Sequence, residues 1–540
     1  MRSETMILKD HLRYAGSEEF LLTAWGLYQF WKGRIELAGK ALRLNATAVK
    51  LRRESRFVIP PWEIVGLLTV YLEAYDNLTD SRLKPKHLDV QGWDTIAGLI
   101  NAYRDITNCQ SMDGIEKDTK SLFEMMPRIM LQQFTWQTGY DAPRFIIRGT
   151  FINYCPEARA VFKSRYGLDA ETFFTISTAL TAHFNRVPHF TNLNMFSSIG
   201  ISEANVKKYL SIVSITVKNA SKAAKADGAA TRRGLDFRVS RVFDYPIFKI
   251  GNDIRFAYTC PFPELLIYRA TYFIYFDIMG ATDRSYGRPL RKMAFEAKSA
   301  MDKRFELYCV ELARRSIPAP ISCRGDFTYG QVGFQRHTTD LLLHTGNRVS
   351  IAAECKSKKM NISVRLSPRP VRDNPEQLDD LAKGVVQIWR FFGDLKKGVV
   401  IEDGTPWAAA NDFVGALITL EEWADHNQVF TEECFRRANE INDSAQGSDD
   451  FVEEADKTPV CIISATEYEN MLREIRPECL PVYLAGFAKY QREFDAKGFS
   501  PLHLKKENPE GKHPLAEKLH EFLPVVPALH QHGLFLGRGT

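Results

Sequence analysis

The stretch "RHTTDLLLHTGNRVSIAAECKSKK", residues 336–359, places charged side chains beside two strongly apolar runs. The runs flank a Gly-Asn pair at 346–347, and both of these residues tolerate positive φ, so we expect two strands joined by a tight turn. Asp340 precedes the first run, and Glu354 and Lys356 end the second. Charges are costly next to buried apolar strands, so this pattern calls for a chemical explanation.

The length of the turn decides which residue lies opposite Asp340. A two-residue turn pairs Asp340 with Ala353, whereas a three-residue turn pairs it with Glu354. In either register the two carboxylates lie at the same level of the hairpin. Alternation along a strand then places Glu354 and Lys356 on one face and Cys355 on the other.

Two carboxylates at one level repel each other, and a bound divalent cation removes that repulsion. Oxygens from Asp340, Glu354 and the main-chain carbonyl of Cys355 suit Mg²⁺ or Mn²⁺, and Mg²⁺ readily shares phosphate oxygens with a substrate. Lys356 would lie beside the ion, where an ammonium group can position a water or stabilise charge that develops on a phosphate. The pattern therefore predicts a metal-dependent site for phosphodiester hydrolysis.

Asp340, a hairpin turn and then Glu354-Cys355-Lys356 resemble the D…(D/E)-x-K signature of the PD-(D/E)XK nuclease superfamily, which has the restriction-endonuclease-like fold. The resemblance covers about residues 290–470. It implies a Mg²⁺- or Mn²⁺-dependent nuclease that acts on DNA, with Asp340 and Glu354 as metal ligands and Lys356 as a catalytic residue.

The same resemblance implies two supporting residues. The helix that opens the domain would present Glu306, and the helix after the E-x-K strand would present Gln387. The sequence departs from the family pattern at Thr339, where the signature has proline, and Glu296 follows a phenylalanine just as Glu306 does. A large helical region ahead of such a nuclease is similar to bacterial anti-phage defence effectors, in which the extra region senses a trigger.

The apolar pattern divides the chain into a helical half and a mixed half, an α+β or α/β multidomain protein. Residues 1–241 have apolar positions three and four apart and predict a mostly helical region with a sensing or regulatory role. Residues 242–285 predict a connecting hairpin and a buried helix. Residues 286–473 predict a helix, three strands at 325–334, 339–344 and 348–356, and then helix, strand, helix, strand, which implies a mixed sheet flanked by helices. Residues 474–540 predict a helical and then irregular tail.

Composition is typical of a multidomain cytoplasmic protein. A chain of 540 residues, 45% of them hydrophobic, is too long for one ordinary core. The nine cysteines show neither a C-x-x-C pair nor zinc-finger spacing, which is typical of a reduced compartment. The first residues lack the apolar core of a signal peptide, and the most apolar run, at 263–281, contains charges, so we expect no membrane partner. The absence of a G-x-x-x-x-G-K-[ST] motif argues against a P-loop motor.

Basic residues concentrate between positions 207 and 249, where ten positive minus three negative side chains give +7, against +5 for the whole chain. This segment suits either a surface that follows a phosphate backbone or the solvated faces of helices. We expect nucleic acid, specifically DNA, as one partner, and a phage protein or other trigger as a partner of residues 1–241. Two alternatives stay open: a nucleic-acid-binding protein with an inactive nuclease fold, and a protein-interaction protein whose helical half carries the function.

Overall fold

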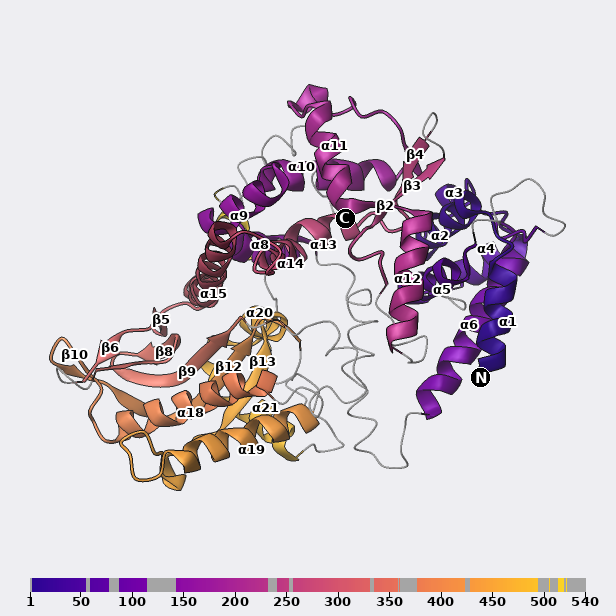
Figure 1. The fold of residues 1–540 in the computed structure, drawn as a ribbon. Coiled ribbons are helices and arrows are strands. Elements are labelled where there is room, and N and C mark those ends of the chain that lie inside the picture. Colours follow the sequence, from indigo (N-terminus) through magenta and orange to yellow (C-terminus); the bar gives the residue numbers. More distant parts are fainter. Residues whose placement is uncertain are drawn as a thin grey trace. The chain divides into compact units, whose positions relative to one another are not determined.

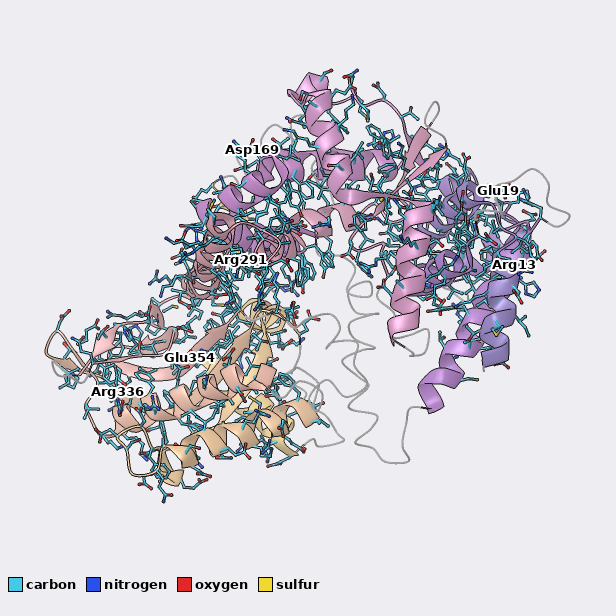
Figure 2. All side chains as sticks on the ribbon, in the orientation of Figure 1. Arg13, Glu19, Asp169, Arg291, Arg336 and Glu354 are labelled. Carbon is cyan, nitrogen blue, oxygen red and sulfur yellow. The ribbon has the colours of Figure 1, made fainter. Side chains whose placement is uncertain are left out.

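The computed structural model describes residues 2–54, 59–76, 87–113, 142–231, 240–251, 256–330, 335–357, 359, 376–422, 428–493, 505, 513–518 and 521. The chain is a mixed α/β protein with two compact units (Figure 1). Unit 1 comprises residues 1–117, 130–295 and 520–540, and unit 2 comprises residues 118–129 and 296–519. Arg13 belongs to unit 1, whereas Arg336 and Glu354 belong to unit 2 (Figure 2).

Unit 1 is mostly helical and carries one small mixed sheet of order β1-β4-β3-β2. Its helices are α1 (Arg2–Leu12), α2 (Ser17–Trp31), α3 (Ile35–Ala38), α4 (Ala46–Arg53), α5 (Pro61–Ala74), α6 (Trp93–Asp113), α8 (Ala142–Asn153), α9 (Pro156–Tyr166), α10 (Ala170–Phe184), η2 (Ser197–Ile199), α11 (Glu203–Val213) and α12 (Val217–Thr231). Its strands are β1 (His189–Phe190), β2 (Ser214–Thr216), β3 (Ile247–Gly251) and β4 (Phe256–Thr259). β3 and β4 form the hairpin expected near residue 251. The helical pattern of residues 1–241 does not predict β1 and β2, which pair with the two edges of that hairpin.

The most apolar run of the sequence, around residues 263–281, forms two short helices instead of the single buried helix that its pattern predicts. These are α13 (Leu265–Thr271) and α14 (Ile274–Gly280). Arg269 and Asp277 interrupt the apolar pattern and form a buried ion pair, with 2.7 Å between Nη2 and Oδ1. Removing one partner of such a pair typically costs about 3–5 kcal/mol, so each charge allows the other to be buried. Among the described helices, none is both long and apolar enough to cross a membrane.

Part of the core of unit 1 lies between α2 and α5. Phe20 and Tyr71 are buried and stack with their ring centroids 4.1 Å apart. The indole N–H of Trp25 donates to the main-chain oxygen of Phe184 at 2.7 Å, which links α2 to the end of α10. A buried indole needs such an acceptor, so this contact fixes the packing of the two helices as well as filling space.

Unit 2 is built on a five-stranded mixed sheet of order β13-β12-β9-β8-β5. The strands are β5 (Ser322–Gly325), β8 (Leu341–Thr345), β9 (Arg348–Lys356), β12 (Ala408–Thr419) and β13 (Val460–Ser464). β9, β12 and β13 run parallel, and β8 is antiparallel to both of its neighbours. β9 is buried almost throughout, as expected for a central strand covered on both faces. The predicted mixed sheet is confirmed.

The hairpin of β8 and β9 combines a short turn with a β-bulge. The two-residue turn begins at Gly346, whose φ of 59° favours glycine. The register then shifts by one residue, and Ser350 is left out of the pairing. Beyond the bulge, Ala353 pairs with the residue after Asp340, so Glu354 lies level with Asp340 itself. The two registers left open by the sequence are therefore reconciled: the turn has two residues, yet the carboxylates are opposed.

Helices cover both faces of this sheet (Figure 1). They are α15 (Arg288–Ser316), α18 (Glu376–Lys396), α19 (Gln428–Ser444), α20 (Ala465–Glu474) and α21 (Leu480–Glu493), with short turns η4 (Glu454–Asp456), η5 (Pro477–Cys479) and η7 (Ala516–Lys518). α18 packs on the face that carries Glu354, with its apolar side against Leu417 and Val460. α15 lies on the other face, where the Cys309 thiol contacts that of Cys355.

One predicted strand is placed differently. The run at 325–334 does not continue as a single strand: β5 ends at Gly325, and β6 (Thr328–Tyr329) pairs with β7 (Arg336–His337) in a separate two-stranded sheet. Gly330 has a φ of 98°, which no extended strand adopts, and residues 331–334 lie outside the described residues. A second small hairpin joins β10 (Ile401–Glu402) and β11 (Thr405–Pro406).

The expected domain boundaries also shift. The two units divide at residue 296, within α15, instead of at residue 286. The segment after residue 474 does not stand apart as a tail, because α21 packs against β12 and β13. The side-chain amide of Gln491 donates to the Ile462 carbonyl at 2.7 Å and accepts from the Ile462 N–H at 3.0 Å. Unit 2 therefore continues past the predicted end of its domain.

Close packing of α18 on the sheet depends on Gly415 in β12. A Cβ there would lie 2.5 Å from Cγ2 of Ile388 and 2.8 Å from Cγ2 of Val460. We expect Gly415→Ala to lower the free energy of unfolding by about 1–3 kcal/mol, as overpacked cores do. Urea unfolding of the full chain would measure this. Gly325→Ala is the matched control, because its Cβ would meet its nearest neighbour only at 3.9 Å; an equal loss in both variants would contradict the packing argument.

Candidate active site

Three polar side chains meet where β9 ends beneath α18. The ammonium of Lys356 lies 3.0 Å from Oε2 of Glu354 and donates to Oε1 of Gln387 at 3.2 Å. Glu354 is buried, with 3% of its surface exposed, and Gln387 reaches down from the exposed side of α18. Glu354 and Lys356 thus share one face of the strand, as alternation predicts.

Asp340 is fixed to the same strand through the main chain. Its Oδ2 accepts a hydrogen bond from the Cys355 N–H at 2.7 Å. The carbonyl of Lys356 points the other way, toward β12, where it accepts from the Leu420 N–H at 3.0 Å. Successive residues of a strand direct their main-chain groups to opposite sides, so the Cys355 carbonyl points to the Asp340 side. The three predicted metal ligands, Asp340, Glu354 and the Cys355 carbonyl, therefore face one place.

The Cys355 side chain takes no part in this arrangement. Its thiol is buried on the opposite face of the sheet, against Cys309 of α15. The hydrogen bond with that thiol and burial both raise the pKa of Cys355. A thiol that holds its proton this firmly is a poor nucleophile, so only the main chain of Cys355 belongs to the site.

The electrostatics of the site reflect crowded carboxylates. Burial, followed by the charge of Asp340, raises the pKa of Glu354 to about 8. Burial also raises the pKa of Asp340, and the hydrogen bond from the Cys355 N–H offsets part of this rise. Burial would lower the pKa of Lys356, but the neighbouring Glu354 and Asp340 outweigh this effect, so the pKa of Lys356 lies above its usual range. One ammonium does not fully balance two buried acids.

Glu306 lies at the margin of the site rather than inside it. Burial and the nearby charge of Asp340 raise the pKa of Glu306, while Lys303, 3.2 Å away on the same helix, lowers it. Asp326, an exposed residue just after β5, adds its charge to both Glu306 and Asp340. The sequence pattern did not single out Asp326. In the sequence, Asp326 is marked only as a polar residue directly after β5, the strand that pairs with β8.

The donor groups fit a hard cation. Among the described residues, no group of three or more His, Cys, Asp or Glu side chains is placed to hold a metal ion. The candidate donors are instead two carboxylates and one main-chain carbonyl, which is the donor chemistry of Mg²⁺ and Mn²⁺. Burial and the Asp340 charge raise the pKa of Glu354 despite the neighbouring Lys356, so a further cation would favour its anionic form. A divalent cation would supply that positive charge.

Gly384 of α18 sets the distance between this helix and the site. A Cβ there would lie 2.7 Å from Cδ1 of Leu417, 3.0 Å from Cε of Lys356 and 3.7 Å from Cβ of Glu354. Only glycine lets the helix approach this closely, and the approach brings Gln387, one turn later, within reach of Lys356. The sequence did not mark Gly384, because a glycine inside a helical pattern has many explanations.

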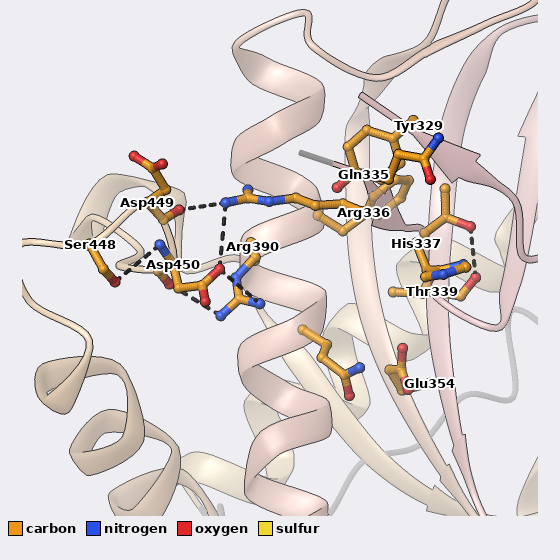
Figure 3. Close-up of a pocket in the computed structure, with 13 residues that line it drawn as sticks. Tyr329, Gln335, Arg336, His337, Thr339, Glu354, Arg390, Ser448, Asp449 and Asp450 are labelled. Carbon is orange, nitrogen blue, oxygen red and sulfur yellow. Dashed lines mark hydrogen bonds and ion pairs between the residues drawn. The ribbon is translucent and has the colours of Figure 1, made fainter. Parts of the chain in front are cut away.

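A pocket of about 640 Å³ opens above the buried carboxylate (Figure 3). Its lining comprises Tyr329, Gln335, Arg336, His337, Thr338, Thr339, Glu354, Gln387, Arg390, Phe391, Ser448, Asp449 and Asp450. Glu354 lies at one end, and the guanidinium groups of Arg336 and Arg390 converge on Asp450 at the other (Figure 3). Thr339, which stands where the family signature has proline, is part of this wall. The site is thus open to a ligand considerably larger than a metal ion.

The structure describes only part of the basic segment at residues 207–249. Arg232, Arg233 and Arg238 lie outside the described residues. Four others contact groups within unit 1: Lys207 with Glu203, Lys208 with the Gly167 carbonyl, Lys225 with the Tyr75 carbonyl, and Arg241 with Asp227. For these four cations the structural explanation is favoured over a surface for phosphates.

Comparisons with known proteins found no relative of this chain. No family model, no curated protein and no solved structure matches it.

The raised pKa of Glu354 predicts how stability depends on pH in metal-free protein. The folded chain holds a proton that the unfolded chain releases between about pH 4.5 and 8, so stability falls as the pH rises through this window. Glu354→Gln removes the buried negative charge. We expect it to raise the free energy of unfolding by on the order of 1–3 kcal/mol near pH 9 and by much less near pH 5.

Urea unfolding of the full chain in EDTA at both pH values would measure this effect. Glu478→Gln, at an exposed glutamate of unit 2, is the control and should leave the pH profile unchanged. A wild-type chain whose stability rises across this window would contradict the buried, poorly compensated carboxylate.

Proposed function

We propose that this protein is a metal-dependent nuclease that hydrolyses phosphodiester bonds in DNA. The observation that carries the proposal is that Asp340, bonded to the Cys355 N–H, and Glu354 lie at one level of the hairpin, with the Lys356 ammonium 3.0 Å from Glu354. Hard oxygen donors next to a fixed cationic group are suited to catalysing phosphoryl transfer. In this reaction, positioning and charge stabilisation provide most of the catalysis.

The position of each residue suggests a role. Asp340 and Glu354, with the Cys355 carbonyl, would hold Mg²⁺ or Mn²⁺. The ion would supply Lewis-acid stabilisation of the phosphate and a more acidic water. Lys356, held by Glu354 and Gln387, would orient the attacking water and stabilise the negative charge that builds up on the phosphate. Hydrolysis then breaks one P–O bond, with water supplying the new oxygen on phosphorus and a proton for the leaving hydroxyl.

The order of elements around the site supports the resemblance to PD-(D/E)XK nucleases. A long helix, α15, comes first and presents Glu306 near Asp340. The hairpin with the E-x-K strand follows, and then α18 presents Gln387 to Lys356. These contacts support the roles that the resemblance implies for Glu306 and Gln387. A role for unit 1 in sensing a phage protein or another trigger, as in defence effectors, stays a prediction.

Cleavage assays test the proposal directly. We expect purified protein with Mg²⁺ or Mn²⁺ to cut DNA, with plasmid, single-stranded DNA and RNA assayed in parallel. Asp340→Asn, Glu354→Gln and Lys356→Met should each lower the rate by about a hundredfold or more, because each removes a metal ligand or the charge beside it.

Lys489→Met, on the exposed side of α21, is the matched control and should cut at the wild-type rate. Rates that stay at the wild-type level in Glu354→Gln and Lys356→Met would reject this site. Wild-type protein that binds nucleic acid but never cuts it, with either metal, would favour the inactive-nuclease alternative.

A further inference from the structure

The far end of the pocket contains two arginines that share one acidic partner. Arg336, in β7, lies 3.5 Å from Oδ1 of Asp450, and Arg390, in α18, lies 3.4 Å from the same oxygen. Both guanidinium groups also donate to main-chain oxygens of this segment, Arg336 to Asp449 at 2.7 Å and Arg390 to Asp450 at 3.3 Å. Figure 3 shows the two arginines pointing at Asp450 from different elements.

Two carboxylates form ion pairs with the two arginines at this end of the pocket, and Asp449 adds a third acidic side chain to the lining. Asp394 is buried and accepts from Arg336 at 2.9 Å and from the Tyr329 hydroxyl at 2.6 Å, so it balances one of the two arginines. Asp450 balances the other. A backbone phosphodiester carries one negative charge, as Asp450 does, and arginine donors suit phosphate oxygens well. Asp450 therefore occupies a place that a phosphate could take without changing the charge.

The contacts of Asp450 are those of a replaceable partner. Its side chain is 57% exposed, and its distances to the arginines exceed the 2.7–2.9 Å typical of strong charged hydrogen bonds. Among the described residues, the Nε of Arg390 is buried without a hydrogen-bond partner. The ion pair of Arg390 and Asp450 is thus screened by solvent, and Arg390 keeps a donor without an acceptor. Replacement of Asp450 by an anion with more acceptor oxygens would therefore be favourable.

The segment that carries Asp450 is closed at its base by a side chain of the preceding helix. Asn442 donates to the Val452 carbonyl at 2.9 Å and accepts from the Val452 N–H at 2.8 Å, which closes a loop between α19 and η4. Within the loop, Ser448 makes local hydrogen bonds: its hydroxyl donates to the Ala445 carbonyl and accepts from the Asp450 N–H. The loop tip, residues 445–451, therefore reaches the pocket wall mainly through the two arginines.

The two arginines line the same pocket as Glu354 and Gln387 of the candidate active site, so a nucleic acid strand bound in this pocket would extend past them. Arg390 comes one helical turn after Gln387, and Gln387 accepts a hydrogen bond from Lys356. Both Gln387 and Arg390 line the pocket. A nucleic acid strand carries a phosphate at every nucleotide, so a strand cut beside Lys356 brings further phosphates past the arginines.

We propose that Arg336 and Arg390 form a binding subsite for a backbone phosphate of DNA, and that residues 448–450 occupy this subsite as an internal competitor until DNA displaces them. This inference rests on the proposed function, since it concerns the substrate and the restraint of the same site. Arg336 and Arg390 are positioning residues here: they hold the strand and do not touch the reacting atoms.

Equilibrium binding tests the subsite without requiring cleavage. The full chain, in EDTA, would be titrated into a short fluorescein-labelled DNA duplex at several salt concentrations. We expect Asp450→Asn to tighten binding by about three- to fivefold, the range for release of an exposed ion pair. Arg390→Gln should weaken binding and lower the slope of log affinity against log salt by about one, as loss of one phosphate contact does.

Two further variants make the test specific. Asp443→Asn, an exposed aspartate at the end of the preceding helix, should bind as the wild type does. In an Arg390→Gln background, Asp450→Asn should have a much smaller effect, because the competitor acts in part through that arginine. Far-UV circular dichroism and thermal unfolding would establish that each variant is folded.

The outcomes separate this inference from the proposed function. Folded Asp450→Asn that binds DNA as the wild type does, or folded Arg390→Gln with an unchanged salt slope, would overturn the subsite, even if Glu354-dependent cleavage is observed. The expected changes in binding, without cleavage by any preparation in Mg²⁺ or Mn²⁺, would leave the phosphate subsite standing and reject hydrolysis.

Discussion

Repulsion between Asp340 and Glu354 is the constraint on which the rest of the site depends. Two neighbouring carboxylates tend to separate or to take up a proton. In agreement with this, burial and the charge of Asp340 raise the pKa of Glu354. The Cys355 N–H holds Asp340 in place, and Lys356 holds Glu354. α18 packs over Glu354, which is buried. The protein thereby keeps a concentration of negative charge that a divalent cation can relieve.

Much of this site could be read from the sequence because its parts are close together along the chain. A charged residue on each arm of an apolar hairpin, and the alternation of side chains along a strand, suffice to bring Asp340, Glu354 and Lys356 together. The register itself could not be read. It depends on the bulge at Ser350, and a bulged residue inside a buried strand has no distinctive composition. The mixed sheet flanked by helices followed from periodicity, which reports burial on one or both faces.

The features that escaped prediction depend on contacts between distant segments. Asp326 comes within range of Asp340 only because β5 pairs with β8. Asp450 meets Arg390 only because the loop after α19 folds back over α18. The division between the units falls inside α15, where an unbroken helical pattern gives no sign of a boundary. The strand predicted across Gly330 was wrong, since propensity alone does not reveal the left-handed φ of that residue.

The contact of Gln491 with Ile462 also bears on how copies of this protein behave in concentrated solution. A sheet whose outer strand exposes free N–H and C=O groups can act as a template for a strand from another molecule, and this is a common route to aggregation. At Ile462 both main-chain groups are already taken by one amide side chain of the same chain. A foreign strand would have to displace Gln491 before it could pair there. The parallel strands of unit 2 thus end in a blocked edge, and self-association by strand addition at β13 is disfavoured.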